Sequence, residues 1–437
     1  MQFIEGFDSA RQALEESNAR RAFSAQSETE SVVREICEAV KNQGDAALLR
    51  FERQFSCDSL TNLRVSPEEI EDAWAQTPPE ARRALERAAQ NIRAFHAKQP
   101  VGDWMMSSPD GVFLGQRYTP IERVGMYAPN GRAAYPSTVL MLAIPAQVAG
   151  VEQIVLASPA GKDGKCNATI LAAARVAGIE EIYKIGGAGA MAALAYGTET
   201  IPKVDKIVGP GSIYVTLAKK HLYGTVGIDG LYGPSEVVVL ADFSGEESGE
   251  EGEMARRKSP QIAADLIAQA EHGADSFVCL VCTSRVLCAA VMSEVSSQIE
   301  GNARREILRE SLQNALILRV ETTDEAIRIC DLAAAEHLEI WSQDALALST
   351  RIRHAGAIFL NTPVPLGDYI AGPSHTLPTG ATARFAHGVG VETFLKRTSI
   401  VAASPRAMQS LSGDLGLLAR LEELPGHANA VERAARI

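Results

Sequence analysis

The feature that most constrains this 437-residue chain is an alternation of short β-branched runs with alanine-rich helical stretches. The strand-like runs fall at 153–157, 181–185 and 206–208, and the helix-like stretches fall between them at 168–177 and 190–196. Strands that are joined through helices form a parallel sheet with the helices packed on its faces. The sequence therefore predicts an α/β fold.

A second alternation of the same kind follows, from a helix-like stretch at 260–271 to a strand-like run at 357–360. Between the two series, residues 242–259 are rich in glycine and glutamate, which is typical of a solvated linker or surface excursion. Two α/β units with parallel sheets are thus predicted. Neither contains the complete GxGxxG turn of a dinucleotide-binding Rossmann fold, so we expect both to be incomplete, Rossmann-like domains.

Both ends of the chain are predicted to be helical, because apolar residues recur at helical spacing in the first 100 residues and after about residue 390. We divide the chain into an N-terminal helical arm, a discontinuous first α/β domain, a second α/β domain and a C-terminal helical tail. Their expected limits are 1–24, then 25–126 together with 237–385, then 127–236, and finally 386–437.

Charge and composition exclude several classes of protein. The chain has 42 Lys and Arg against 54 Asp and Glu, a net charge of −12 that disfavours binding to nucleic acid. The longest apolar stretch, 137–151, is too short for a membrane span, and the N-terminus lacks the apolar region of a signal peptide. Seven scattered cysteines do not form a secreted disulfide framework. We therefore expect a cytoplasmic protein.

Two glycine-rich turns each follow a strand and open a helix, beginning at Gly186 and Gly209. Such a turn exposes backbone N–H groups where the helix dipole favours an anion such as phosphate. Tight packing between strand and helix explains either turn equally well.

Several polar residues are of types that bind metals or transfer protons. Gln269 and His272 lie three residues apart and share one face of a helix, where they are either cation ligands or a helix cap. If Glu336 and His337 lie in a turn or at a strand edge, the histidine can act as a general base and the glutamate can activate water. An ordinary solvated pair is the equal alternative.

Two further candidates lie in loop-like segments. Asp368 is in a loop of turn-forming residues, and His427 is near the C-terminus. An aspartate in such a loop is ordinarily an Asx-turn residue, and a terminal histidine is usually solvated. Together with Gln269 and His272 they would make a closed set of nitrogen and oxygen ligands for zinc, if folding brought the four together.

Seven segments taken together resemble the histidinol dehydrogenase family, from about residue 33 to residue 427. They are Tyr135-Pro-Ser-Thr, Ala195-Tyr-Gly-Thr-Glu, Gly233-Pro-Ser-Glu, Gln269-Ala-Glu-His, Glu336-His-Leu, Leu377-Pro-Thr-Gly and Lys396-Arg-Thr-Ser. No single segment is specific, but their combination is.

This resemblance implies a zinc-dependent oxidation of L-histidinol through L-histidinaldehyde to L-histidine, with NAD as the oxidant. It implies that Glu336 and His337 are the acid–base pair. The implied zinc ligands are Gln269, His272, Asp368 and His427. The implied substrate contacts, which suit a cationic amino-alcohol, are Ser235, Gln269, His272, His337, Asp368, Glu422 and His427. It also implies a homodimer in which Glu422 and His427 of the tail serve the partner's active site.

The sequence departs from the family mainly on the cofactor side. Of the implied NAD contacts Tyr127 is kept, but Gly189 replaces a glutamine and Ser212 replaces an asparagine. Tyr232 stands where the family has a small residue. Two alternatives therefore stay open: a paralogous zinc dehydrogenase for another small polar alcohol, and a zinc-binding homologue in which NAD use is weakened or lost.

Overall fold

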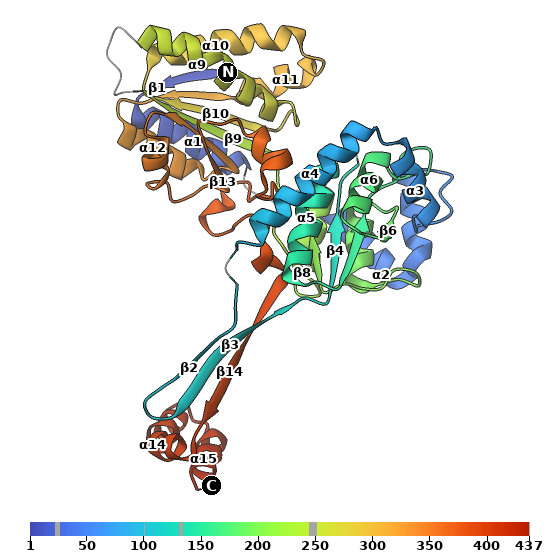
Figure 1. Cartoon of the computed structure of the whole chain (residues 1–437), viewed down its shortest axis with the longest axis vertical. Coiled ribbons are helices and arrows are strands. Elements are labelled where there is room, and N and C mark those ends of the chain that lie inside the picture. The colour runs from blue at the N-terminus through green and yellow to red at the C-terminus, as the bar shows by residue number, and fades with distance from the viewer. Residues whose placement is uncertain (22–26, 100, 131–133, 244–250, 437) are drawn as a thin grey trace.

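The computed structural model describes residues 1–21, 27–99, 101–130, 134–243 and 251–436. Its helices and strands form two α/β units and a long arm that carries the C-terminus away from both (Figure 1). The N-terminus lies in one unit, and the second unit connects that unit to the arm (Figure 1). The mixed α/β class predicted from the sequence is confirmed.

The first unit is built on a six-stranded parallel sheet. Its strands, in spatial order, are β1 (Gln2–Glu5), β11 (Leu316–Arg319), β10 (Phe277–Cys282), β9 (Glu236–Asp242), β12 (His337–Ser342) and β13 (Ala357–Leu360). All seven residues of β9 are buried, because helices cover both faces of the sheet. The covering helices are α1 (Phe7–Arg21), α9 (Glu251–Ala270), α10 (Arg285–Gln298), α11 (Arg305–Ser311), α12 (Thr323–Ala333) and α13 (Ala345–Ser349).

The second unit is built on a five-stranded parallel sheet. Its strands, in spatial order, are β6 (Glu181–Tyr183), β5 (Gln153–Ala157), β4 (Arg123–Tyr127), β7 (Lys206–Val208) and β8 (Gly227–Ile228). Two buried apolar clusters lie on its opposite faces. The helices that supply them are α2 (Ser27–Phe55), α3 (Pro67–Gln76), α4 (Pro79–His96), α5 (Pro136–Ala149), α6 (Ala168–Val176), α7 (Gly187–Tyr196) and α8 (Ile213–Leu222).

The packing of the early helices differs from the predicted grouping. Residues 25–126 were expected to belong with 237–385, but α2, α3 and α4 pack on helices of the second sheet. Helical periodicity shows which face of a helix is apolar, and it does not show which sheet that face meets. The segment at the N-terminus also differs, because β1 adds an edge strand to the first sheet before α1 begins. The predicted excursion at 242–259 is helical from Glu251 onward.

The arm is a three-stranded antiparallel sheet with two helices at its far end (Figure 1). It contains β2 (Trp104–Ser107), β3 (Val112–Pro120), β14 (Leu395–Ala403), α14 (Pro405–Leu421) and α15 (Pro425–Ala434). The tail was expected to be mostly helical, and the nine-residue strand β14 within it was not predicted. All four residues of β2 are exposed, as are several leucines of α14, so this arm has little core of its own within one chain.

Short helical turns connect these elements: η1 (Ile299–Gly301), η2 (Leu312–Asn314), η3 (Gly367–Ala371), η4 (Thr382–Arg384) and η5 (Val391–Phe394). Within the described ranges, no helix combines the length and apolar character needed to cross a membrane.

Candidate active site

A cavity of about 550 Å³ lies between the two α/β units. The first unit contributes residues at the amino ends of β9 and β12, among them Ser235 and His337. The second unit contributes the glycine turn that follows the carboxyl end of β7, at 210–213. Polar groups from distant parts of the sequence therefore meet in one cleft, which is where small-molecule sites commonly form.

Glu336 and His337 lie at the start of β12, and both are buried. The Nδ1 atom of His337 is 3.0 Å from the carbonyl oxygen of Glu236, and its Nε2 atom is 3.1 Å from Oδ1 of Asp368. A carbonyl can only accept, so Nδ1 carries a proton and donates it. The Oε2 atom of Glu336 lies 3.5 Å from Nδ1 of His337, so the predicted pair does meet in one place.

Burial and neighbouring charges shift the proton affinities of this pair. Burial raises the pKa of Glu336 to about 8, although the nearby His337 imidazole acts to lower it. Burial alone lowers the pKa of His337, but the carboxylates of Glu336 and Asp368 outweigh it and raise the value to about 9. Shifted pKa values of this kind are typical of residues that transfer protons. The pair can therefore hold and release protons near neutral pH.

Gln269 and His272 line the same cavity from the end of α9. Asp368 faces them from η3, a single π turn, and it does not form the Asx turn that its loop sequence suggested. Burial raises the pKa of Asp368, but His337, His375 and His272 outweigh burial and lower it. This carboxylate is thus held ionised among three imidazoles.

The donor set fits zinc in its chemistry, and it is incomplete in one chain. Gln269, His272 and Asp368 supply one amide, one imidazole and one carboxylate, which are ligand types that zinc accepts. Across the part of the chain that the structure describes, no three His, Cys, Asp or Glu side chains gather closely enough to hold a metal. A further ligand is needed to close such a site.

Glu422 and His427 are not brought into this cavity within one chain. Glu422 directly follows α14, His427 lies in the first turn of α15, and both are exposed at the far end of the arm. Figure 1 shows α14 and α15 well separated from the two α/β units. That Glu422 and His427 complete the active site of a partner subunit therefore remains a prediction.

His375 is a pocket residue to which the sequence analysis gave no role. Its Nδ1 donates to the backbone carbonyl of Asp368 at 2.8 Å, and its Nε2 is 3.0 Å from Oγ1 of Thr138. It thus ties the Asp368 turn to α5 of the other unit. The available signal was its place at the end of the same glycine- and proline-rich loop as Asp368.

Of the three predicted cofactor contacts, Ser212 lines the cavity. Tyr127 is buried, and its hydroxyl accepts a hydrogen bond from the backbone N–H of Gly187 at 3.3 Å. Gly189 lies inside α7, where an added Cβ atom would be 3.1 Å from Cδ1 of Leu48 on α2. The Cβ atom of any side chain at position 189 would therefore point toward the interface between α7 and α2.

We expect Gly189→Gln to destabilise the protein by about 0.5–2 kcal/mol, because overpacking of the interface between α7 and α2 outweighs the helix propensity gained by removing a glycine. Urea titration of the two proteins measures this difference. The double variant Gly189→Gln/Leu48→Ala is the matched control, since it opens space beside the new side chain. If Gly189→Gln instead unfolds at the wild-type urea concentration and tightens NAD binding, the assigned direction of this side chain is wrong.

A second buried network shapes the opposite wall of the cavity. The Nζ atom of Lys219 is 2.5 Å from Oδ1 of Asp229, and both side chains are 1% exposed. Asp229 accepts hydrogen bonds from the N–H of Gly209 at 2.7 Å and from the hydroxyl of Tyr232 at 3.0 Å. This ion pair therefore fixes both the glycine turn that precedes Ser212 and the Tyr232 ring that lines the cavity.

Fold and pocket together define a class: an α/β enzyme with a buried Glu–His pair beside nitrogen and oxygen donors, in a cleft between two parallel-sheet units. The sequence model of histidinol dehydrogenase matches residues 19–435. The chain belongs to the histidinol dehydrogenase family, and it is an oxidoreductase.

Individual relatives agree with this assignment over nearly the whole chain. Histidinol dehydrogenase of Synechococcus sp. is 47% identical over 408 residues, which cover 92% of this chain and 91% of the relative. That of Geobacillus kaustophilus is 47% identical over 408 residues, covering 93% of each. The crystal structure of histidinol dehydrogenase from Elizabethkingia anophelis has a TM-score of 0.92 at 34% identity, covering 100% of this chain and 98% of that one. The resemblance seen in the sequence is confirmed.

Proposed function

We propose that this protein oxidises L-histidinol through L-histidinaldehyde to L-histidine, using NAD and a zinc ion. The observation that carries the proposal is the meeting of the Glu336–His337 pair with Gln269, His272 and Asp368 in one cavity of a histidinol dehydrogenase-like chain. Zinc held by these three donors and His427 of a second subunit would polarise the substrate oxygen, and bound NAD would accept hydride.

His337 is suited to remove the hydroxyl proton of the alcohol. Its Nδ1–H donates to the carbonyl of Glu236, so Nε2 is the nitrogen that exchanges a proton: it donates to Asp368 when the ring is charged, and it accepts the alcohol proton once the ring is neutral. Loss of that proton and of a hydride converts the alcohol to the aldehyde. The pair must then act a second time to reach the acid.

Glu336 serves the aldehyde stage in this proposal. As a carboxylate it takes a proton from the water whose oxygen adds to the aldehyde carbon, which gives the hydrate as its monoanion. The raised pKa of Glu336, about 8, means that it accepts this proton more readily than an exposed glutamate does. A second proton and a second hydride then leave the hydrate and give the carboxylate product.

The proposal includes a homodimer in which each tail completes the other subunit's pocket. Leu417, Leu418, Leu421 and Leu424 are exposed at the end of the arm, which is the location expected of an unpaired interface. Glu422 and His427 lie among them. Delivery of these two residues by the partner would add the missing ligand and a second carboxylate for a cationic substrate.

Mixing two inactive variants, His337→Asn and His427→Asn, is expected to restore activity if sites are shared. In a randomly reassorted twofold dimer half of the dimers are hybrids, and each hybrid has one intact site, so about a quarter of the activity should return. The measurement is NADH formation after dissociation and reassembly. Each variant reassembled alone is the control. No recovery from a mixture proven to contain hybrids would place His337 and His427 in sites of the same subunit.

Metal and cofactor dependence test the proposal most simply. Removal of metal with a chelator should abolish NADH formation from L-histidinol, and added Zn²⁺ should restore it. NAD affinity is measured separately by calorimetry. Activity that persists in metal-free protein would exclude the zinc mechanism. Absence of NAD binding would favour the non-redox homologue suggested by the Gly189 and Ser212 departures.

A second candidate function is oxidation of another small polar alcohol. Its support is Tyr232, which lines the cavity and is held rigidly by Asp229. A ring at this position reduces the space open to a substrate. Comparing kcat/KM for L-histidinol with that for other amino-alcohols separates the two functions.

We also place the protein in the cytoplasm in this proposal. All seven cysteines are free and buried, as expected of a chain that folds in a reducing compartment.

A further inference from the structure

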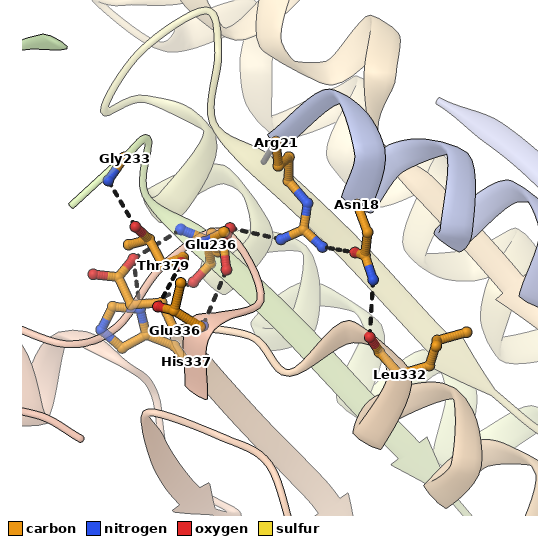
Figure 2. Close-up of polar contacts among 10 residues, drawn as sticks. Asn18, Arg21, Gly233, Glu236, Leu332, Glu336, His337 and Thr379 are labelled. Carbon is orange, nitrogen blue, oxygen red and sulfur yellow. Dashed lines mark hydrogen bonds and ion pairs between the residues drawn. The ribbon is translucent and has the colours of Figure 1, made fainter. Parts of the chain in front are cut away.

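A buried arginine of the N-terminal helix contacts the network behind the acid–base pair. Nη1 of Arg21 is 2.6 Å from Oε1 of Glu236, and these side chains are 9% and 1% exposed. The guanidinium also lies 3.7 Å from the ring centroid of Phe277 and donates to Oδ1 of Asn18. Asn18 in turn donates to the carbonyl of Leu332 at 2.9 Å (Figure 2). Arg21 is thus fixed from several sides.

Glu236 connects this arginine to both members of the pair. Its Oε2 accepts the backbone N–H of Glu336 at 3.2 Å, and its own N–H donates to Oε2 of Glu336 at 2.9 Å. Its carbonyl accepts Nδ1–H of His337 at 3.0 Å (Figure 2). The same residue therefore orients the carboxylate of Glu336 and selects the tautomer of His337.

The side chain of Glu236 also holds the loop that follows Thr379. Its Oε1 accepts the N–H of Gly380 at 2.8 Å, and Oγ1 of Thr379 accepts the N–H of Gly233 at 2.6 Å. Both Thr379 and Gly233 line the cavity. One carboxylate thus joins β9, β12 and this loop.

A carboxylate this deeply buried needs a compensating cation, and the structure supplies Arg21. Without that charge, the buried Glu236 carboxylate would shift toward water, which removes an acceptor from the amide of Glu336 or of Gly380. Arg21 lies more than 300 residues before the pair in sequence and does not line the cavity. The mechanism proposed above gives it no role.

We propose that Arg21, acting through Glu236, is a positioning residue that holds Glu336 and His337 in their reactive geometry. The inference rests on the proposed function for its reaction and on the contacts in Figure 2 for its geometry. Misplacement of reacting groups by a fraction of an ångström to 1 Å lowers the rate of chemistry while leaving substrate affinity largely intact.

The test compares Arg21→Met with Arg20→Met, because Arg20 is the exposed neighbour on the same helix. For L-histidinol oxidation with saturating NAD and Zn²⁺, Arg21→Met is expected to lower kcat about 10- to 100-fold with KM changed less than about threefold. Arg21→Lys, which keeps the charge, should recover part of the loss. Arg20→Met should match the wild type.

A double-mutant cycle tests the connection through Glu236. Adding Arg21→Met to Glu236→Gln should change kcat by less than about threefold, because the charge that Arg21 balances is already gone. The double variant also covers the case in which Arg21→Met alone fails to fold, since it contains no uncompensated charge. A further loss of tenfold or more in the double variant would show that Arg21 acts independently of Glu236 and would overturn the proposal.

Amide hydrogen exchange separates this proposal from the proposed function. Peptides containing Glu336 and Gly380 should exchange faster in Arg21→Met than in Arg20→Met, whether or not the protein oxidises L-histidinol. Failure of the wild type to oxidise L-histidinol would reject the proposed function alone. Unchanged exchange, or a folded Arg21→Met with wild-type kcat, would overturn the role of Arg21.

Discussion

Replacing His337 by asparagine is expected to lower kcat for L-histidinol oxidation by about 10²- to 10⁴-fold, the usual contribution of a general acid–base residue. Asparagine can still donate toward the carbonyl of Glu236, but it has no imidazole nitrogen to accept a proton beside Asp368. The loss should therefore appear in the chemical step. Steady-state kinetics and zinc content, measured on the same preparation, check this.

The matched control is His221→Asn, because His221 is an exposed histidine on α8 outside the cavity. It should leave kcat and zinc content unchanged. If folded, zinc-loaded His337→Asn turns over at a rate within a few-fold of the control, His337 is not the base. Loss of zinc together with activity would instead make its main role the orientation of Asp368.

Lys219→Met is expected to reduce the free energy of unfolding by about 3–5 kcal/mol, because it leaves the Asp229 carboxylate buried without its cation. Burial lowers the pKa of Lys219, and the attraction of Asp229 opposes this by raising it. Each buried charge therefore depends on the other. Loosening Asp229 also frees the Gly209 turn and Tyr232. Chemical denaturation gives the change in stability, and kcat/KM shows its effect on the cavity.

Lys220→Met provides the control on the neighbouring residue. Lys220 forms an exposed ion pair with Glu30 at 3.0 Å, and removal of such a pair costs at most about 1 kcal/mol. The double variant Lys219→Met/Asp229→Asn should recover part of the stability, since it removes both charges. Equal stability of Lys219→Met and Lys220→Met would contradict the assigned importance of the buried pair.

The order of strands and helices was largely predictable, because local composition changes where one element gives way to the next. Runs such as 153–157 and 206–208 are strands in the structure, and 168–177 is helical except at its last residue. Which elements distant in sequence pack against one another was not predictable in the same way. The apolar face of α2 does not specify which sheet it meets, and the mixed composition of β14, which is exposed at most positions, does not specify that it pairs in an arm.

The candidate site was predictable where residues close in sequence share a function. Gln269 and His272 lie together near the end of α9, and Glu336 and His337 lie together where β12 begins. Asp368 was a candidate ligand from its chemistry, but only the resemblance to a family implied that it joins them. Arg21 gave no local signal of its proposed role, and His375 gave only its place in the same loop as Asp368, because Glu236 and Thr138 are distant from them in sequence.

The cofactor side shows the limit of position-by-position inference. Gly189 was expected to lie beside NAD, yet a Cβ atom added at this position would point toward Leu48. Ser212 does line the cavity, as expected of a cofactor contact. We therefore attribute the change at position 189 to the packing of α2, and we propose that any effect on NAD binding arises mainly at Ser212.

The most direct measurement of the central claim is the stoichiometry and product of a complete reaction. A limiting amount of L-histidinol is incubated with excess NAD and zinc-loaded protein, NADH is followed by absorbance, and the product is identified by NMR. We predict two NADH for each L-histidinol and L-histidine as the product. Release of the aldehyde with one NADH, or no NADH from folded, zinc-loaded protein, would contradict the claim that this pocket performs both oxidations.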